Sequence, residues 1–158
     1  NVYLTSKIIT WVNNVMEKEN ENAMFVTVFM GILNTKTGEF TYTNAGQNPT
    51  FIKRADGRVD KLTDLHGVVI AAMEGLKYKE SKLMLNPGDM IFAYTDGIPE
   101  ATSDSGEFFG RQRLTGLLEA SSKSAAALVE TIAGSVAAHT GEAEQFDDIT
   151  ILAVRRNG

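Results

Sequence analysis

Residues 90–101 read MIFAYTDGIPEA and place a carboxylate directly after an apolar run. Residues 90–93 predict a buried strand, because a short apolar run bounded by turn residues is typical of one. Asp96 follows at the end of this strand, with Gly97 beside it and Pro99 close behind. Two alternatives follow: Asp96 is an ordinary turn residue, or it is held at the end of a strand to bind something positively charged.

A second pair of carboxylates precedes the last predicted strand. Asp147 and Asp148 come directly before residues 149–154, which read ITILAV. If the two strands are antiparallel neighbours, the end of one lies beside the start of the other, so Asp96 and Asp147 would meet at one edge of the sheet. A divalent cation would relieve their mutual repulsion, and carboxylates with water suit Mg²⁺ or Mn²⁺. Ordinary turn composition remains the alternative, since Asp-Gly is a common turn dipeptide.

The rest of the chain predicts an α+β fold with a mainly antiparallel sheet. Apolar residues at helical spacing predict helices at residues 5–19, 111–119 and 125–139. Short apolar or alternating runs between Gly, Asn and Pro turns predict further strands at residues 24–33, 39–43, 50–53, 59–62 and 78–85. Residues 24–33 are apolar on both faces, which favours a central strand.

The first predicted helix carries an apolar face, and we expect Ile8, Val12 and Val15 on that face to lie in the core. The chain has two histidines. His66 lies in a predicted loop and His139 at the end of a predicted helix. For both residues a structural role is favoured over a catalytic one.

Composition excludes several classes of protein. The chain has 158 residues, a net charge of −5 and no cysteine. Its length predicts one domain spanning residues 1–158. The lack of clustered Lys and Arg argues against nucleic acid as a partner. The lack of cysteine excludes disulfides, zinc-thiolate sites and cysteine nucleophiles, and fits a cytoplasmic location. No apolar stretch reaches transmembrane length, so we expect no direct membrane insertion.

Several short motifs follow one another in a fixed order, and each is weak alone while the ordered set is specific. They are FVTVF with Gly31, TG at 37–38, NAGQNP at 44–49, PGD at 87–89, YTDGIPEA at 94–101, FG at 109–110 and FDDIT at 146–150. This set resembles the C-terminal part of the metal-dependent protein phosphatases, the PPM family. The resemblance is to the bacterial branch typified by stage II sporulation protein E and the sigma-factor regulatory phosphatases.

The resemblance implies a fold and a site. The fold is an antiparallel β-sandwich flanked by helices. The metal ligands and catalytic residues are Asp96 and Asp147, which would help to hold two Mn²⁺ or Mg²⁺ ions in the complete domain. Gly97 would allow a close approach of the backbone, Asp148 would orient the loop or a bound water, and Glu100 would lie near the site without binding metal.

The resemblance also implies a function. The chain would be a phosphoric monoester hydrolase that uses water to dephosphorylate serine or threonine in a bacterial regulatory protein, such as a phosphorylated anti-sigma-factor antagonist. It would need no cysteine or serine nucleophile. An upstream sensor or receiver domain would provide the input signal.

The chain departs from the family pattern in three places. Gln47 replaces the His of an Asn-Ala-Gly-His turn. Ile70 and Ala71 stand where many relatives carry Leu-Gly, which we interpret as a packing change. The family's early Gly-Asp-Tyr-Tyr-Asp-like strand and Asp-x-Ser-Gly-His-Gly-like turn, which supply the remaining ligands, are not found before Met24. We therefore expect the C-terminal portion of the domain, with about half of a two-metal site. The alternative is a catalytically incomplete regulatory module that binds a partner protein.

Overall fold

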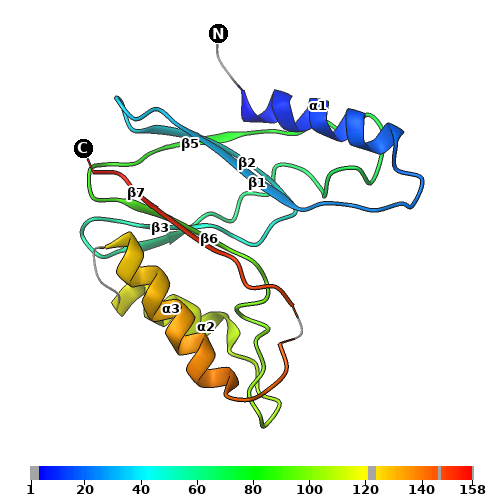
Figure 1. Cartoon of the computed structure of the whole chain (residues 1–158). Helices are drawn as coiled ribbons and strands as arrows, with labels where there is room; N and C mark the ends of the chain where they lie inside the picture. The colour runs from blue at the N-terminus through cyan, green and yellow to red at the C-terminus, as the bar shows by residue number, and fades with distance from the viewer. Residues whose placement is uncertain (1–3, 121–123, 146, 158) are drawn as a thin grey trace. The chain divides into compact units, whose positions relative to one another are not determined.

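The computed structural model describes residues 4–120, 124–145 and 147–157 (Figure 1). Phe146, which begins the FDDIT motif, lies outside the described residues. The chain divides into a first unit of residues 1–47 and 63–85 and a second unit of residues 48–62 and 86–158. Each unit has its own antiparallel sheet, and the two are described separately.

The first unit contains one described helix and a three-stranded sheet in the order β1-β2-β5. Its elements are α1 (Thr5–Lys18), β1 (Val28–Leu33), β2 (Glu39–Ala45) and β5 (Ser81–Met84). Helix α1 packs on β1 and β2. A small core forms around Ile9, Ala45, Ile70 and Tyr78.

The prediction of a central strand at residues 24–33 is wrong for the described sheet. Strand β1 begins only at Val28 and lies at the sheet edge, while β2 has a hydrogen-bonded neighbour on each side. Met24 and Phe25 are exposed and precede the strand, and Val26 forms an isolated antiparallel bridge with Ile70. An apolar run predicts burial but does not say how many neighbours a strand has.

The second unit contains a four-stranded sheet in the order β4-β3-β6-β7. Its strands are β3 (Phe51–Lys53), β4 (Val59–Lys61), β6 (Met90–Tyr94) and β7 (Ile151–Arg155). Strand β6 lies between β3 and β7, and four of its five residues are buried. The prediction of a buried strand at this point is confirmed.

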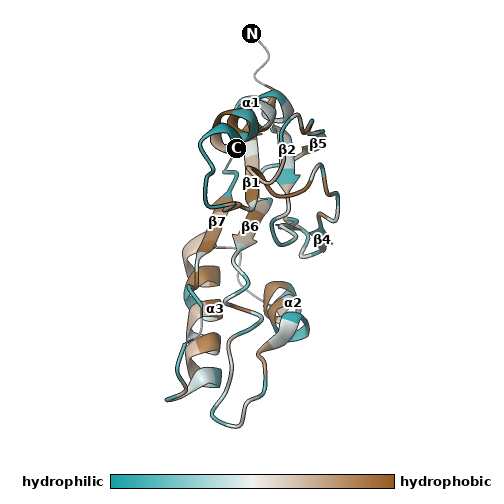
Figure 2. Ribbon diagram, turned by 90° about the vertical axis from the view of Figure 1, so that its right-hand side faces the viewer, coloured by the Kyte–Doolittle hydropathy of each residue, from teal (hydrophilic) through white to brown (hydrophobic). Residues whose placement is uncertain are grey.

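Two helices of the second unit, α2 (Gly110–Ala120) and α3 (Ala125–Thr140), lie on one face of this sheet (Figure 1). Apolar residues recur along α3, β6 and β7 (Figure 2). They meet in a core of buried side chains: Phe51, Met90, Phe92, Tyr94, Ile98, Phe109, Leu114, Leu118, Leu128, Ile132 and Val136. Tyr94 at the end of β6 and Ile98 after it belong to this core, so the core fixes the position of the end of β6.

A buried carboxylate sets the turn that leads into β6. Asp89 accepts hydrogen bonds from the backbone amides of Asn86 and Ala55, each at 2.9 Å, and pairs with the Arg54 guanidinium at 2.9 Å. Burial alone would raise the pKa of Asp89, but these donors outweigh it and hold the pKa below its usual value. Asp89, the aspartate of the PGD motif, therefore stabilises the turn at which β6 begins.

The fold class is α+β with antiparallel sheets, as the sequence predicted. Among the described helices, none is both long enough and apolar enough to cross a membrane.

Candidate active site

The antiparallel pairing of β6 with β7 brings together the segments that carry Asp96 and Asp147. Tyr94 is paired with Ile151 at the end of the ladder. Beyond it, the Thr95 amide donates to the Thr150 carbonyl at 3.2 Å, and the Thr150 amide donates to Thr95 Oγ1 at 2.9 Å. The neighbourhood of these two strands, on which the sequence argument depended, is present.

A threonine and a glycine hold the two segments in contact beyond the ladder. Thr95 Oγ1 donates to the carbonyl of Asp148 at 2.8 Å. Gly97 packs so closely against the same carbonyl that a Cβ built on it would lie 2.6 Å from the Asp148 oxygen. The structure thus places Gly97 at a close approach of the two segments, where a side chain does not fit. The backbone of Asp148 receives both contacts.

The carboxylates of Asp147 and Asp96 are differently engaged. Asp147 Oδ1 accepts the Asp148 amide at 2.7 Å, and Gln145 Nε2 donates to the Asp147 carbonyl at 2.7 Å. The Asp96 carbonyl accepts the Glu100 amide at 3.0 Å, while its side chain is exposed. Within the part of the chain that the structure describes, neither Asp147 Oδ2 nor the Asp96 carboxylate makes a hydrogen bond.

These oxygens suit a hard divalent cation but form an incomplete ligand set. Mg²⁺ and Mn²⁺ favour carboxylate and water oxygens, and Mg²⁺ requires near-octahedral coordination. No group of three or more His, Cys, Asp or Glu placed to hold an ion occurs among the described residues. The carboxylates of Asp96 and Asp147 are therefore chemically suited to such a cation, but two carboxylates do not complete its coordination.

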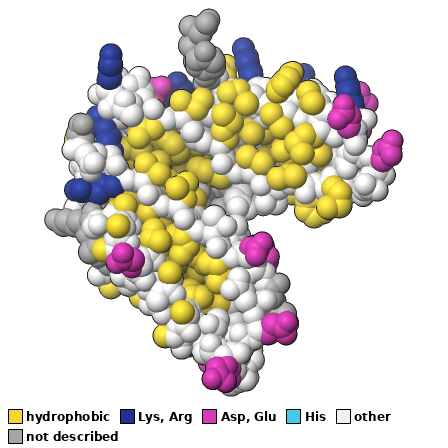
Figure 3. Space-filling view, in the orientation of Figure 1, with side chains coloured by type: hydrophobic (Ala, Val, Ile, Leu, Met, Phe, Trp, Pro, Cys, Tyr) yellow, Lys and Arg dark blue, Asp and Glu magenta, His cyan; other side chains and the backbone are white. Residues whose placement is uncertain are grey.

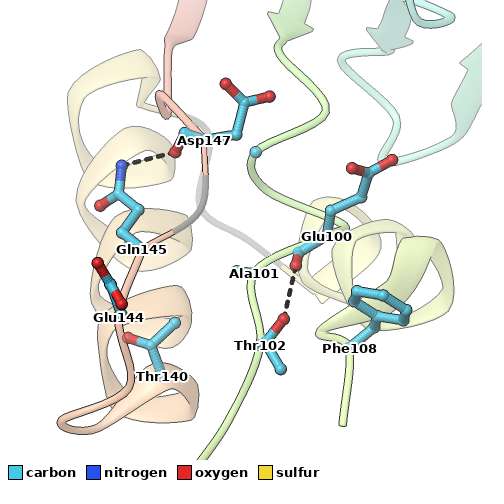
Figure 4. A pocket seen from close by; sticks show the side chains of 9 residues that line it. Glu100, Ala101, Thr102, Phe108, Thr140, Glu144, Gln145 and Asp147 are labelled. Carbon is cyan, nitrogen blue, oxygen red and sulfur yellow. Dashed lines mark hydrogen bonds between the residues drawn. The ribbon is translucent and has the colours of Figure 1, made fainter. Parts of the chain in front are cut away.

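A cavity of about 290 Å³ lies directly beside Asp147 (Figure 4). We call it the flanking pocket. Figure 4 shows residues of the loop after β6 on one side, and the end of α3 with the segment before β7 on the other. Its lining residues are Gly97, Glu100, Ala101, Thr102, Phe108, Thr140, Glu144, Gln145 and Asp147.

Sequence reasoning did not find most of this pocket. It placed Glu100 near the site, but it assigned nothing to Phe108, Thr140, Glu144 or Gln145. One signal was available in the pair of phenylalanines before α2, because two adjacent side chains on an extended segment rarely share one environment. Phe109 is 3% exposed in the core, whereas Phe108 is 62% exposed at the pocket.

The charges around the second unit's helices are acidic on the face shown in Figure 3. Over α3 and the loop that follows it, the charged side chains visible in that view are Asp or Glu. The pocket itself is lined by three carboxylates and, among its described lining residues, by no Lys or Arg. The field at the candidate site therefore favours cations.

His66 has a structural environment in the first unit. Its Nδ1 accepts the Asn44 amide at 2.9 Å, and its Nε2 lies 2.9 Å from Ser81 Oγ. Burial lowers the pKa of His66, against the opposing effect of Asp64 and Glu80. The accepted amide bond requires an unprotonated Nδ1, so the neutral ring is the folded form.

Gln47, at the position where the resemblance predicts a histidine, also lies in the first unit and holds the NAGQNP turn. Its amide donates to Asn44 Oδ1 at 2.8 Å, and Asn44 Nδ2 donates to its carbonyl at 3.0 Å. Its side-chain oxygen accepts a hydrogen bond from Thr27 at 3.0 Å. Gln47 is therefore part of a satisfied turn.

Comparison with known proteins identifies relatives across nearly the whole chain. The family model described as Stage II sporulation protein E (SpoIIE) matches residues 3–157. Protein IcfG of Synechocystis sp. is 35% identical over 143 residues, which are 90% of this chain and 22% of that protein. Phosphoserine phosphatase RsbU of Bacillus subtilis is 29% identical over 152 residues, 96% of this chain and 45% of that protein. The chain thus spans less than half the length of these curated relatives.

Solved structures share the fold at low sequence identity. The SiaA-PP2C domain of Pseudomonas aeruginosa has a TM-score of 0.81 and 21% identity, with 95% of this chain and 60% of that chain covered. The manganese-soaked phosphatase domain of SpoIIE from Bacillus subtilis has a TM-score of 0.70 and 18% identity, with 100% and 68% covered. The fold is therefore that of PP2C-type phosphatase domains.

Proposed function

The chain belongs to the family of stage II sporulation protein E, and on that premise we propose that it acts in a metal-dependent protein serine/threonine phosphatase. The observation that carries the proposal is the pairing of β6 with β7, because it brings the Asp96 and Asp147 segments into contact. The relative RsbU, which bears the name phosphoserine phosphatase, supports the same reaction class.

In this proposal Asp96 and Asp147 hold Mn²⁺ or Mg²⁺ through their carboxylate oxygens. The cations, when bound, supply positive charge that polarises a phosphoryl oxygen and acidifies a water. Gly97 lets the two segments approach, and Asp148 orients its loop through the carbonyl that accepts Thr95 Oγ1. Residues 1–158 form the C-terminal portion of the phosphatase domain, and further ligands come from outside them.

The proposed substrate is a phosphoserine or phosphothreonine residue in a regulatory protein. The ordered motifs described above support the narrower class of phosphorylated anti-sigma-factor antagonists, with input from an upstream sensor or receiver domain. The absence of cysteine agrees with hydrolysis by water rather than by a thiolate nucleophile.

The full-length protein tests this proposal. With Mn²⁺ or Mg²⁺ it should hydrolyse p-nitrophenyl phosphate and a phosphoserine protein, and a chelator should stop both reactions. Asp96→Asn and Asp147→Asn should each lower kcat/KM by about 100-fold or more, since each 1.4 kcal/mol of lost transition-state stabilisation costs tenfold.

Asp104→Asn is the matched control, because it removes the same charge from an exposed loop residue that does not line the pocket. Its kcat/KM should stay within about twofold of the wild-type value, in line with a surface substitution. Full activity in either Asp96→Asn or Asp147→Asn would contradict the site assignment.

The second candidate is a catalytically incomplete module that binds a partner protein through the same surface. One observation favours it: among the described residues, no three or more His, Cys, Asp or Glu side chains are grouped so that they could hold a metal ion. Phosphatase activity of the full-length protein with Mn²⁺ would exclude it. Metal-independent binding of an unphosphorylated regulator, together with no hydrolysis, would favour it over the enzyme.

A further inference from the structure

We propose that the flanking pocket receives a lysine or arginine side chain of the phosphoprotein substrate, from a residue close in sequence to the phosphorylated one. This inference rests on the proposed function, because it assigns a recognition element to the same site. Glu100, Glu144 and Phe108 are its specificity-determining residues.

One wall of the pocket is apolar. Ala101 and Phe108 line it, and Phe108 is 62% exposed although its neighbour Phe109 is buried. An aromatic face open to solvent attracts a guanidinium or ammonium group and also packs against an alkyl stem. This wall therefore suits a long side chain with an apolar body.

Three polar side chains of the pocket already make hydrogen bonds. Thr102 Oγ1 donates to the Glu100 carbonyl at 3.0 Å, and Thr140 Oγ1 donates to the Ala137 carbonyl at 3.2 Å. Gln145 Nε2 is also engaged, through its bond to the Asp147 carbonyl. These three side chains are therefore hydrogen-bonded within their own segments of the chain.

The carboxylates of Glu100 and Glu144 are in a different position. Neither makes a hydrogen bond or ion pair with any residue that the structure describes, and both residues are exposed at the pocket. An ionised carboxylate only accepts hydrogen bonds. The occupant must therefore bring donors, and a positive charge makes these bonds stronger.

An arginine, Arg113, contacts the backbone of the pocket residue Phe108. Arg113 could neutralise the pocket, but its guanidinium is paired with Glu107 at 2.7 Å. It also donates to the carbonyls of Phe108 and Phe109 at 2.9 and 3.1 Å. Arg113 therefore fixes the loop before α2, and the acidic field of the pocket remains. Such a field repels a phosphate group and attracts a basic side chain.

The pocket is small and adjoins the candidate metal site. At about 290 Å³ the pocket lies at the lower end of the range for small-molecule sites, so it suits one side chain better than a whole ligand. It shares Gly97 and Asp147 with the candidate metal site. A peptide whose phosphate is bound through metal ions at Asp96 and Asp147 would thus have its flanking residues beside Glu100 and Glu144.

The test uses phosphoserine peptides that differ at a single position. Arg, Ala or Glu is placed in turn at each position within about four residues of the phosphoserine, which covers roughly 13 Å of extended chain. The full-length protein should show one position at which Arg raises kcat/KM by about tenfold over Ala, as charge-assisted pairing predicts. Equal kcat/KM for all three residues at every position would overturn the inference.

Variants then assign the preference to the pocket. Glu100→Gln and Glu144→Gln should together reduce the Arg-to-Ala ratio to about one, and Glu144→Lys should make the Glu peptide the better substrate. Glu142→Gln is the matched control, since it removes the same charge two residues away from Glu144 without lining the pocket. A ratio that survives the double variant would overturn the assignment.

A binding measurement separates failure of this inference from failure of the proposed function. Fluorescence anisotropy with full-length Asp96→Asn reports peptide binding without turnover. One outcome is that the wild-type protein hydrolyses no peptide, while the Arg peptide still binds about tenfold tighter than the Ala peptide and this preference depends on Glu144. In that case the phosphatase proposal fails and the pocket assignment stands. Hydrolysis without any Arg preference gives the reverse result.

Discussion

Ala71 has a backbone conformation that ordinarily belongs to glycine. Its φ is 66°, in the left-handed region that side chains disfavour, and its own side chain is buried. Its amide donates to Asn13 Oδ1 at 3.0 Å, and its carbonyl accepts Asn20 Nδ2 at 2.9 Å. Glycine would adopt this φ without strain, so packing alone does not describe position 71, whereas Ile70 is buried in the core of the first unit. The two hydrogen bonds hold the alanine in this conformation.

At Gly97 the addition of a single carbon atom should destabilise the fold. Gly97→Ala would put Cβ 2.6 Å from the Asp148 carbonyl oxygen, and because that atom is backbone it cannot turn aside. We expect the free energy of unfolding to fall by about 2 kcal/mol, the cost typical of overpacking. Urea denaturation measures it.

Gly116→Ala is the control for this prediction. A Cβ at Gly116, within α2, meets no atom within 4 Å. The free energy of unfolding should rise by about 0.5–1 kcal/mol, because alanine favours a helix interior over glycine. A Gly97→Ala protein as stable as the wild type would refute the close approach of the two segments.

At the scale of elements, α1 buries a face that its apolar pattern does not predict. The buried residues are Thr5, Ile9 and Asn13, whereas Val15 and Trp11 are exposed. Asn13 is satisfied in the interior: it accepts from the Ala71 amide and donates through Nδ2 to the Met73 carbonyl at 3.0 Å. Our expectation that Val15 lies in the core is wrong, because hydrogen bonds to a distant loop orient the helix.

Helix α2 ends at a buried lysine from another element. Lys53 Nζ, on β3, donates to the Leu118 carbonyl at 2.6 Å and to the Glu119 carbonyl at 3.4 Å. The last carbonyls of a helix have no partner within it and carry its negative pole. A cation there satisfies both needs and ties α2 to the sheet.

Lys53→Met tests this tie, since it keeps the alkyl stem and removes the donor. We expect the free energy of unfolding to fall by about 1–2 kcal/mol, with unfolding followed by circular dichroism in urea. Lys61→Met on β4 is the control, because Lys61 is exposed and its replacement should change stability by less than about 0.5 kcal/mol. Equal effects of the two substitutions would argue against the lysine's capping role.

For the whole molecule, acid should act on stability in two steps. The folded pKa of His66 is lowered by burial, and that of Asp89 is lowered because its hydrogen-bond donors and Arg54 outweigh burial. In both cases the folded state binds fewer protons than the unfolded state. Stability is therefore complete above the unfolded pKa values, about 6.5 for His and 3.9 for Asp, and falls as pH decreases through the folded values.

Urea midpoints measured from pH 8 to pH 2.5 check this expectation. His66→Gln should flatten the loss that begins near pH 6.5, and Asp89→Asn should flatten the loss that begins near pH 3.9. Both variants start from lower stability at pH 7, so the slope with pH is the informative quantity. A slope unchanged in either variant would show that the named residue does not cause that step.

The sequence by itself determined the local order of this protein. Apolar runs ending in Thr-Asp-Gly or beginning after Asp-Asp predicted β6 and β7, and the ordered motifs predicted the family, because periodicity and turn chemistry are properties of neighbouring residues. The prediction that Asp96 lies near Asp147 depended on the condition that their strands pair.

Only the tertiary structure decided that pairing, the edge position of β1, the buried face of α1 and the flanking pocket. The pocket joins Glu100, Phe108 and Glu144 from segments that are separate in the sequence. Which segments meet depends on the balance of packing and hydrogen bonding between residues far apart along the chain, as at Asn13 and Lys53. A local sequence pattern does not determine that balance. The candidate site carboxylates could therefore be identified from the sequence, whereas the cavity beside Asp147 could not.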